Sequence, residues 1–447
     1  MIILSINSGS SSVKFLVFDY NEGLTLATGI VERVTVGNSF IKYSVKGCEP
    51  TQVSHNCPDH KEAIQLILNT LVDRNVRVLD SLNQISAVGH RAVHGGERFT
   101  KSVIIDNDVI NTMKDISDLA PLHNPPNILG MEAAMAVLPQ VPHIAIFDTA
   151  WHQTMPQHVY MYALPREWYE KYHVRRYGFH GTSFLYVAKR AATLLGKDPF
   201  KCNLVCLHIG NGASINAIKN GCSYDTSMGL TPLEGLIMGT RSGDHDPAID
   251  LYMMGKENIT PKAMNDLLNK KAGVLGITGK YTDRRDVQIA AESGDEKARL
   301  AIDMESYRLK KYIGAYMAAL GNTDAVVFTA GVGEMSDLIR ARSLEGLESL
   351  GIKLDPERNK LAKTRSAETM ISTPDSKVKV FVIPTDEERV FIEDVVALKS
   401  GSYNEHTKFR YAFQDPEYIN KQRETEFKRE CDRNPKLAAV QVKPPKR

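Results

Sequence analysis

A strand–turn–strand pattern that occurs twice constrains this chain more than any other feature. Residues 204–218 consist of an apolar run, a turn of Gly, Asn and Ser, and a second apolar run. Residues 2–18 repeat the pattern around a Ser-rich turn at 7–12. Each pattern predicts a β-hairpin, and glycine in such a turn lets backbone N–H groups approach an anion closely. One such turn would only reverse the chain, whereas the pair predicts two related domains that face one polyphosphate.

The composition excludes several classes of protein. The chain has 447 residues, 43% of them hydrophobic and 24% charged, which is typical of a globular protein of two or three domains. The net charge is +2, and the part before residue 401 is slightly acidic, which argues against a nucleic-acid partner. Six cysteines in a chain of this length are no disulfide framework. No apolar run approaches a membrane span and no signal-peptide pattern is found, so we predict a cytoplasmic protein with no membrane partner.

Strands alternate with helices along the chain, which predicts an α/β fold. Helical spacing of apolar residues is found at 61–73, 261–271 and 295–320. In the last of these, the spacing predicts one core-facing stripe. The stripe consists of Leu300, Met304, Tyr307, Tyr312, Tyr316 and Leu320.

Polar and glycine-rich segments follow several of the predicted strands, where they are well placed to meet a ligand. Arg91 lies in such a segment, Asp148 directly follows an apolar strand, and Gly331-Val332-Gly333 follows another. The last of these lacks the third glycine of the dinucleotide-binding motif, and the chain has no P-loop motif. The segment 55–60 contains His, Cys and Asp, but its spacing matches no zinc pattern, so we expect a solvated loop there.

Taken together, these segments resemble the acetate kinase family, which belongs to the superfamily of acetate and sugar kinases, heat-shock ATPases and actin. The resemblance covers residues 1 to about 398. It rests on long stretches in the family's order, namely residues 7–14, 89–91, 93–97, 121–126, 147–150, 152–156, 176–183, 239–244 and 331–334.

The resemblance implies an α/β protein with two domains of one duplicated actin-like (ribonuclease H-like) fold and an active-site cleft between them. The N-terminal domain would cover residues 1–150, completed by the C-terminal helix at about 388–400. The C-terminal domain would cover residues 151–387, bind the nucleotide and form a homodimer.

The implied reaction is ATP + acetate ⇌ ADP + acetyl phosphate, by direct in-line transfer with Mg²⁺, or Mn²⁺ in its place. Acetate is ionised at pH 7, so its oxygen needs no general base. Catalysis then rests on aligning two anions and neutralising the moving phosphoryl group. The family places Arg91 and Arg241 on the carboxylate and the phosphoryl group, and His180 on the transition-state oxygens. Asp148 is a catalytic carboxylate in the family, and we favour metal or water positioning over proton removal as its role.

The resemblance also implies the binding residues. Asn7 and Glu387 would be oxygen ligands of the metal ion. The methyl group of acetate would lie in a small apolar pocket of Val93, Leu122, Phe179 and Pro232. The phosphates would contact Lys14, His208, Ile209, Gly210, Asn211 and Gly212, and the nucleoside Asp283, Arg284, Arg285, Gly331, Val332, Gly333, Glu334 and Met335.

Four positions depart from the family's usual residues, one of them His245 in place of Ile. Phe184 replaces His beside the active-site loop, and Met335 and Asp386 each replace Asn. Propionate or butyrate kinase activity stays open, because a methylene group changes binding by only a few kcal/mol. Pyrophosphate as the phosphoryl donor also stays open. A non-catalytic nucleotide-binding module would not need the set of Arg91, His180 and Arg241.

Residues 401–447 form a polar C-terminal extension that the resemblance does not cover. It has an excess of four basic residues over acidic ones and is interrupted by proline, and we expect it to be dispensable for chemistry and its final dozen residues to be disordered. It is either a solvated extension or is anchored across the first domain by aromatic side chains. These are Phe409, Tyr411, Phe413, Tyr418 and Phe427.

Overall fold

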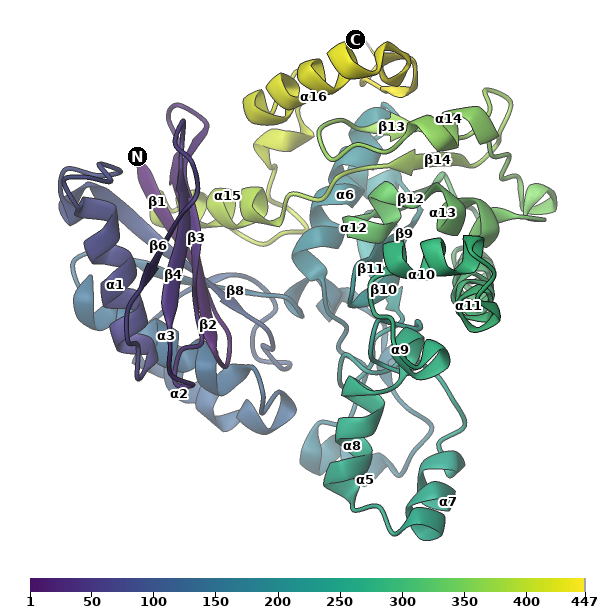
Figure 1. Ribbon diagram of the computed structural model, residues 1–447, viewed down its shortest axis with the longest axis horizontal. Coiled ribbons are helices and arrows are strands. Elements are labelled where there is room, and N and C mark those ends of the chain that lie inside the picture. Colours follow the sequence, from purple (N-terminus) through teal and green to yellow (C-terminus); the bar gives the residue numbers. More distant parts are fainter. Residues whose placement is uncertain (446–447) are drawn as a thin grey trace. The chain divides into compact units, whose positions relative to one another are not determined.

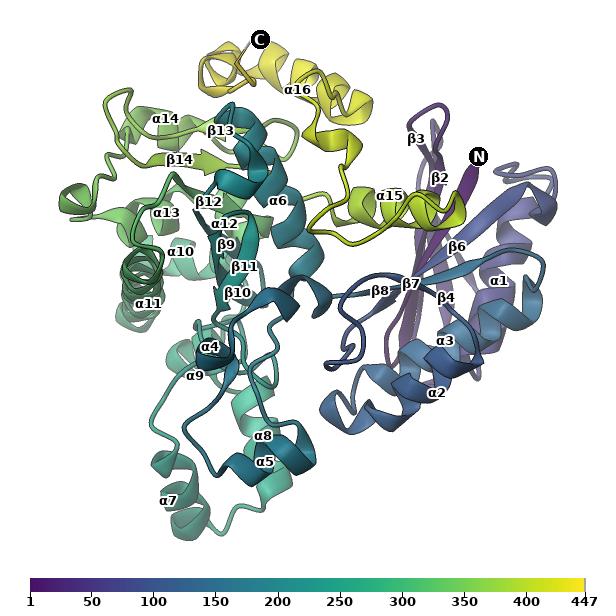
Figure 2. The same ribbon diagram turned by 180° about the vertical axis from the view of Figure 1, so that it is seen from behind.

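The computed structural model describes residues 1–445 and divides into two compact units, each with its own β-sheet (Figures 1 and 2). Unit 1 consists of residues 1–153, 386–412 and 420–422. Unit 2 consists of residues 154–385 and 413–419 and of the described residues from 423 onward.

The sheet of unit 1 has eight strands in the order β5-β4-β3-β2-β1-β6-β8-β7. Strands β1 to β5 form an antiparallel meander, whereas β1, β6 and β8 are parallel. The bounds are β1 Ile2–Ser8, β2 Ser12–Asp19, β3 Leu24–Glu32, β4 Phe40–Val45, β5 Thr51–Ser54, β6 Ile85–Ala92, β7 Val103–Ile104 and β8 His143–Phe147.

Helices cover both faces of this sheet. Side chains alternate along β1, so that Leu4 and Ile6 pack in the core beneath α1 and α3, whereas Ile3 packs with Phe391 of α15 on the opposite face. A Cβ on Gly89 of β6 would lie 2.8 Å from the side chain of Val395, so glycine permits the close packing of α15. The helices are α1 His60–Val72, α2 Asn107–Asp115, α3 Asn124–Val137 and α15 Glu387–Lys399.

The sheet of unit 2 has six strands in the order β11-β10-β9-β12-β14-β13. Strand β9 is antiparallel to β10 and parallel to β12, and β12 is parallel to β14. The bounds are β9 Leu204–Ile209, β10 Ala213–Lys219, β11 Cys222–Thr226, β12 Ala325–Thr329, β13 Thr369–Met370 and β14 Lys379–Val382.

The two sheets share one topology. In each, three antiparallel strands form a meander, and two further strands lie parallel to the meander strand that comes first in the chain, β1 or β9. The order is β3-β2-β1-β6-β8 in unit 1 and β11-β10-β9-β12-β14 in unit 2. The two predicted hairpins are β1–β2 in unit 1 and β9–β10 in unit 2. The prediction of an α/β protein with a duplicated fold is therefore confirmed.

Local sequence signals place the helices of unit 2. For example, Asp295 caps the N-terminus of α11, and Gly321, with φ of 78°, ends that helix. The helices are α4 Gln157–Tyr160, α5 Arg166–Tyr172, α6 Gly181–Leu194, α7 Ala248–Glu257, α8 Pro261–Lys270, α9 Gly273–Thr278, α10 Arg284–Glu292, α11 Glu296–Leu320, α12 Ala330–Met335, α13 Asp337–Leu344 and α14 Pro356–Leu361. No helix within residues 1–445 is long and apolar enough to cross a lipid bilayer.

The predicted apolar stripe of α11 is wrong in its first half. Leu300, Met304 and Tyr307 are exposed, whereas Tyr316 and Leu320 are buried. At about 100° of rotation per residue, the first three residues lie on the side of the helix opposite to the last two. The buried face instead begins with small residues, Ala298 and Ala301.

The C-terminal extension is packed rather than solvated. Tyr411 is buried in unit 1, where its hydroxyl donates to Asp394 of α15 over 2.9 Å. Phe413 and Phe427 are buried in unit 2, so the aromatic anchors do not all lie on the first domain as predicted. The extension also forms α16 Lys421–Arg433.

The prediction of a disordered end is wrong for its described residues. A 3₁₀ helix, Pro435–Val440, buries Leu437 and Val440 in unit 2. Residues 446 and 447 lie outside the described residues.

Candidate active site

Three predicted site residues lie at one edge of the sheet of unit 1. Asn7 is near the end of β1, Arg91 is near the end of β6, and Asp148 directly follows β8. Since β1, β6 and β8 are parallel, their C-terminal ends meet at this edge, where ligands of α/β sheets commonly bind.

Arg91 and Asp148 form a two-bond ion pair. Nε of Arg91 donates to Oδ1 of Asp148 over 3.1 Å, and Nη2 donates to Oδ2 over 2.7 Å. Asp148 is only 2% exposed, and its charge is the main cause of the raised pKa of Arg91. The pair therefore fixes the guanidinium in position and keeps it charged, with Nη1 not used in these two bonds.

Two asparagines of α3 hold the segment that follows Arg91. Asn127 donates to the carbonyl of Ser8 over 2.6 Å and accepts from the N–H of Val93 over 3.0 Å. Asn124 bonds both the N–H and the carbonyl of His94. Of the two, Asn124 lies in the Pro-rich stretch at 121–126, where the sequence indicated a role for Leu122 alone. Val93 is half-buried, whereas Leu122, predicted for the same pocket, is 67% exposed.

The start of α15 brings carboxylates near Arg91. Glu387 is the first residue of α15, and its charge contributes to the raised pKa of Arg91. Asp386 caps the helix by accepting from the N–H of Arg389, and its other oxygen accepts from Asn420 of the extension over 3.0 Å. Lys14 of β2 is exposed and lies opposite Asn7 in the hairpin.

In unit 2, the second glycine turn lies beside two further predicted catalytic residues. A Cβ on Gly212 would lie 3.6 Å from Nη1 of Arg241 and 3.7 Å from Nε2 of His180. The backbone of the turn, one guanidinium and one imidazole therefore converge on one place.

His180 is held by two contacts. Its Nδ1 lies 2.7 Å from the hydroxyl of Ser214, and its ring stacks on that of His208 with centroids 4.0 Å apart. His208 in turn bonds Ser183 over 2.8 Å. Phe184, one of the departures from the family, is buried with its ring edge-on to His208. The ring of His180 is thus fixed with Nε2 directed at the turn.

Arg241 is a partly buried cation without a carboxylate. Its Nη1 donates to the carbonyl of Pro232 over 3.1 Å, and burial lowers its pKa. Among residues 1–445, no carboxylate forms an ion pair with it. A guanidinium whose charge is not neutralised by the protein is suited to an anionic ligand.

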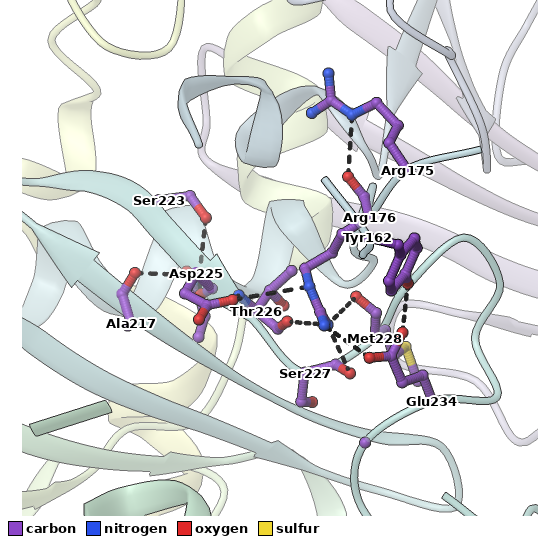
Figure 3. A network of polar contacts seen from close by, with 12 residues as sticks. Tyr162, Arg175, Arg176, Ala217, Ser223, Asp225, Thr226, Ser227, Met228 and Glu234 are labelled. Carbon is purple, nitrogen blue, oxygen red and sulfur yellow. Dashed lines mark hydrogen bonds and ion pairs between the residues drawn. The ribbon is translucent and has the colours of Figure 1, made fainter. Parts of the chain in front are cut away.

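A network around Arg176 positions the loop that carries Pro232 (Figure 3). Arg176 donates to the carbonyl of Thr226 over 2.7 Å and to the carboxylate of Glu234 over 2.7 Å. The hydroxyl of Tyr162 donates to the other oxygen of Glu234. Pro232 lies between Thr226 and Glu234, which Arg176 holds. Because Arg241 donates to the carbonyl of Pro232, the network helps to position Arg241. The sequence did not indicate this role of Arg176, although Arg175 and Arg176 stand side by side in it.

The predicted nucleotide segments lie near the same turn. The N–H of Gly239 donates to the carbonyl of Asn211 over 3.1 Å, and a Cβ on Gly239 would lie 3.1 Å from Nη1 of Arg284. Arg284 is buried in an ion pair with Glu305, with 3.0 Å between Nη2 and Oε1, whereas Arg285 is exposed.

The Gly331–Met335 segment forms α12 at the end of β12. Glu334 is buried there, which raises its pKa, and it accepts from the N–H of Thr385 over 3.2 Å. Among the pocket residues, Phe179 and Pro232 belong to unit 2, and Val93 and Leu122 to unit 1.

Comparisons with known proteins agree with these features. The sequence model of the acetokinase family matches residues 2–393. The acetate kinase of Geobacter sulfurreducens is 62% identical over 421 residues, which are 94% of this chain and 100% of that protein. The acetate kinase of Treponema pallidum is 57% identical over 443 residues, 99% of each chain.

Solved structures are similar over the same region. The crystal structure of Porphyromonas gingivalis acetate kinase has a TM-score of 0.86 and 45% identity, and covers 89% of this chain and 99% of that one. A propionate kinase from Francisella tularensis has a TM-score of 0.82 and 38% identity, with 89% and 99% covered. The chain described here belongs to the acetokinase family.

Proposed function

We propose that this protein is an acetate kinase, which transfers a phosphoryl group between ATP and acetate with Mg²⁺ by direct in-line displacement. The observation that carries the proposal is the convergence of Arg241, His180 and the Gly210–Gly212 turn. These groups suit a phosphoryl group in transfer. They supply a guanidinium without a carboxylate partner, an imidazole held in place and the backbone of a glycine turn. The acetate kinases among the relatives support the same substrate.

The chemistry assigns a role to each charged residue. Acetate is already a nucleophile at pH 7, so Asp148 is not needed as a base. Since both of its oxygens bond Arg91, Asp148 orients that guanidinium toward the acetate carboxylate or the phosphoryl group. Arg241 and Nε2 of His180 stabilise the charge on the equatorial oxygens of the phosphoryl group.

The proposed metal site fits the donor groups of unit 1. Asn7 and Glu387 would hold the ion, since amide and carboxylate oxygens are ligands that Mg²⁺ and Mn²⁺ accept. Within residues 1–445 there is no cluster of three or more His, Cys, Asp and Glu side chains that could hold a metal ion. Mg²⁺ sites commonly keep several waters and bind substrate phosphates beside one or two carboxylates. When bound, the ion would neutralise charge on the phosphate chain.

ATP would contact unit 2 at the segments His208–Gly212, Asp283–Arg285 and Gly331–Met335, with Lys14 of unit 1 on the phosphates. The methyl group of acetate would contact Val93, Leu122, Phe179 and Pro232. Both assignments are part of the proposal.

We also propose a homodimer. Exposed apolar side chains on α5, α7 and α8 support it, because these helices lie together at one end of unit 2 in both views (Figures 1 and 2) and a contiguous apolar surface is typical of a protein–protein interface. The side chains are Trp168, Tyr172, Ile249, Leu251, Tyr252 and Leu267. Light scattering of the purified protein at micromolar concentration tests this, and a monomer's mass would refute it. A cytoplasmic location stays a prediction.

The experiment that tests the function is a hydroxamate assay for acyl phosphate. We expect product with Mg-ATP and acetate, and less with propionate or butyrate. Greater turnover of propionate would favour a propionate kinase, which is the name of one structural relative. Product with pyrophosphate instead of ATP would refute the nucleotide donor, and no product with any donor would refute the proposal.

A further inference from the structure

Helix α16 of the C-terminal extension holds a loop of unit 2 on both sides of one arginine. Glu430 accepts from the hydroxyl of Thr364 over 2.5 Å and from the hydroxyl of Ser366 over 2.9 Å. Arg365 lies between these residues. Beyond the loop, the N–H of Val442 donates to the carbonyl of Glu368 over 2.9 Å. The extension therefore fixes the chain on either side of Arg365.

The guanidinium of Arg365 lies against α12. Its Nη2 would be 3.5 Å from a Cβ on Gly331, and its Nε is 3.8 Å from Oε2 of Glu334. The side chain is 68% exposed, so its ion pair with Glu334 is long and largely solvated. An incompletely neutralised guanidinium thus lies over Gly331, a partly exposed glycine without a side chain of its own.

A second arginine of the extension reaches the same part of unit 2. Arg423 donates to the carbonyls of Pro384 and Thr385 over 2.9 and 2.6 Å. The N–H of Thr385 bonds Glu334, the carboxylate beside Arg365. The positive charges of Arg423 and Arg365 oppose the effect of burial, which raises the pKa of Glu334. The extension is therefore built into the surroundings of α12 at two points.

We propose that Arg365 binds the phosphate chain of the nucleotide and that Glu430 is the positioning residue that holds it beside Gly331. This rests on the proposed role of Gly331–Met335 in nucleotide binding. Guanidinium N–H groups match phosphate oxygens in charge and geometry, and fixing the loop in advance reduces the entropy lost on binding. The extension is thereby part of the nucleotide site of unit 2.

The test is titration of the full-length protein with a fluorescent N-methylanthraniloyl derivative of ADP. Arg365→Ala should raise the Kd about three- to tenfold, the scale for a partly exposed charged contact. The KM for ATP should rise more than the KM for acetate. Arg365→Lys should recover part of the affinity, since it keeps the charge but not the fork.

Glu430 is tested by coupling to Arg365. Glu430→Ala should raise the Kd in the same direction by a smaller factor, and the double variant should bind no more weakly than Arg365→Ala alone. The matched control is Glu426→Ala on the same helix, whose carboxylate pairs with Arg429 of α16 and should leave the Kd unchanged. Circular dichroism and melting curves show whether each variant is folded.

An unchanged Kd in folded Arg365→Ala would overturn the proposal, and additive effects in the double variant would overturn the role of Glu430. Nucleotide affinity that depends on Arg365 in a protein without acetyl phosphate production would refute the proposed function and leave this inference standing. If the protein produces acetyl phosphate but its nucleotide affinity does not depend on Arg365, the proposed function stands and this inference is refuted.

Discussion

The two units use their candidate catalytic arginines in opposite electrostatic states. Arg91 of unit 1 is neutralised by a buried carboxylate, with two hydrogen bonds of 3.1 and 2.7 Å. The guanidinium of Arg241 in unit 2 forms no ion pair within residues 1–445; it donates to the backbone carbonyl of Pro232 and to the sulfur of Met238, and burial lowers its pKa. Removal of Arg91 would leave the buried carboxylate of Asp148 without its cation, whereas Arg241 carries an electrostatic cost that an anionic ligand would relieve. We therefore expect both arginines to be needed for turnover, but only the loss of Arg91 to lower the stability of the fold.

The largest expected effect is that of Arg241→Ala on turnover. We expect kcat to fall about 10²- to 10³-fold, the scale for the loss of one preorganised charged donor. Arg241→Lys should also lose most activity, because an ammonium cannot reproduce the guanidinium geometry. The melting temperature should stay the same or rise, since an unneutralised charge has been removed. The hydroxamate assay and a thermal melt measure both, and an active variant would exclude Arg241 from the mechanism.

Arg91→Ala should lower kcat by at least about 10²-fold and also destabilise the protein. The variant leaves Asp148 buried without its cation, which costs about 1–3 kcal/mol of unfolding free energy. Adding Asp148→Asn should restore part of the melting temperature but none of the activity. If Arg91→Ala melts like the wild type, or Arg241→Ala melts much lower, the contrast between the two arginines is wrong.

Asp394 of unit 1 differs from both arginines, because a buried carboxyl can lose its charge by taking up a proton. Burial raises its pKa to about 7, although Ser102 and Tyr411 donate hydrogen bonds to it. In the unfolded chain this carboxyl titrates near its ordinary value of about 3.9. Between these two values the folded state holds a proton that the unfolded state has released, so stability falls as pH rises through this window and is level above it.

Asp394→Asn should flatten this slope, because an amide does not titrate. Chemical denaturation at several values between about pH 4 and 8 measures the effect, with Asp415→Asn on the exposed part of the extension as the control. A slope that persists unchanged in Asp394→Asn would show that other groups cause it. Turnover relative to the folded fraction should not change, since Asp394 lies on α15 outside the candidate site.

The framework of both sheets could be predicted from the sequence because the apolar runs are short, dense and bounded by glycine turns. The chain also places Arg91, Asp148, His180 and Arg241 beside such turns. Which side chains pair could not be predicted, since Arg91 and Asp148 meet only when β6 and β8 align. The asparagines of α3 and the contacts of Arg176 are equally invisible, because their partners are mostly backbone groups distant in sequence.

The errors have physical causes as well. In α11, apolar residues occur on two sides of the helix, and spacing alone does not show which side is buried. In the extension, the polar average composition predicted a disordered end, although Leu437 and Val440 are buried there. Average composition describes the exposed majority of such a segment, whereas docking depends on a small number of anchors.

The smallest expected effect concerns Val93, the residue that follows the Arg91 strand. Its N–H is held by Asn127, so Val93→Ala should remove side-chain volume without moving the backbone. If this side chain borders the methyl group of acetate, the variant should shift relative kcat/KM toward propionate by a few-fold to about tenfold, the scale for one methylene group. Leu122→Ala, at an exposed position, should shift it less. Equal preference in wild type and Val93→Ala would remove Val93 from the pocket, while a general loss of activity with both acids would instead indicate that the substitution disturbs Arg91.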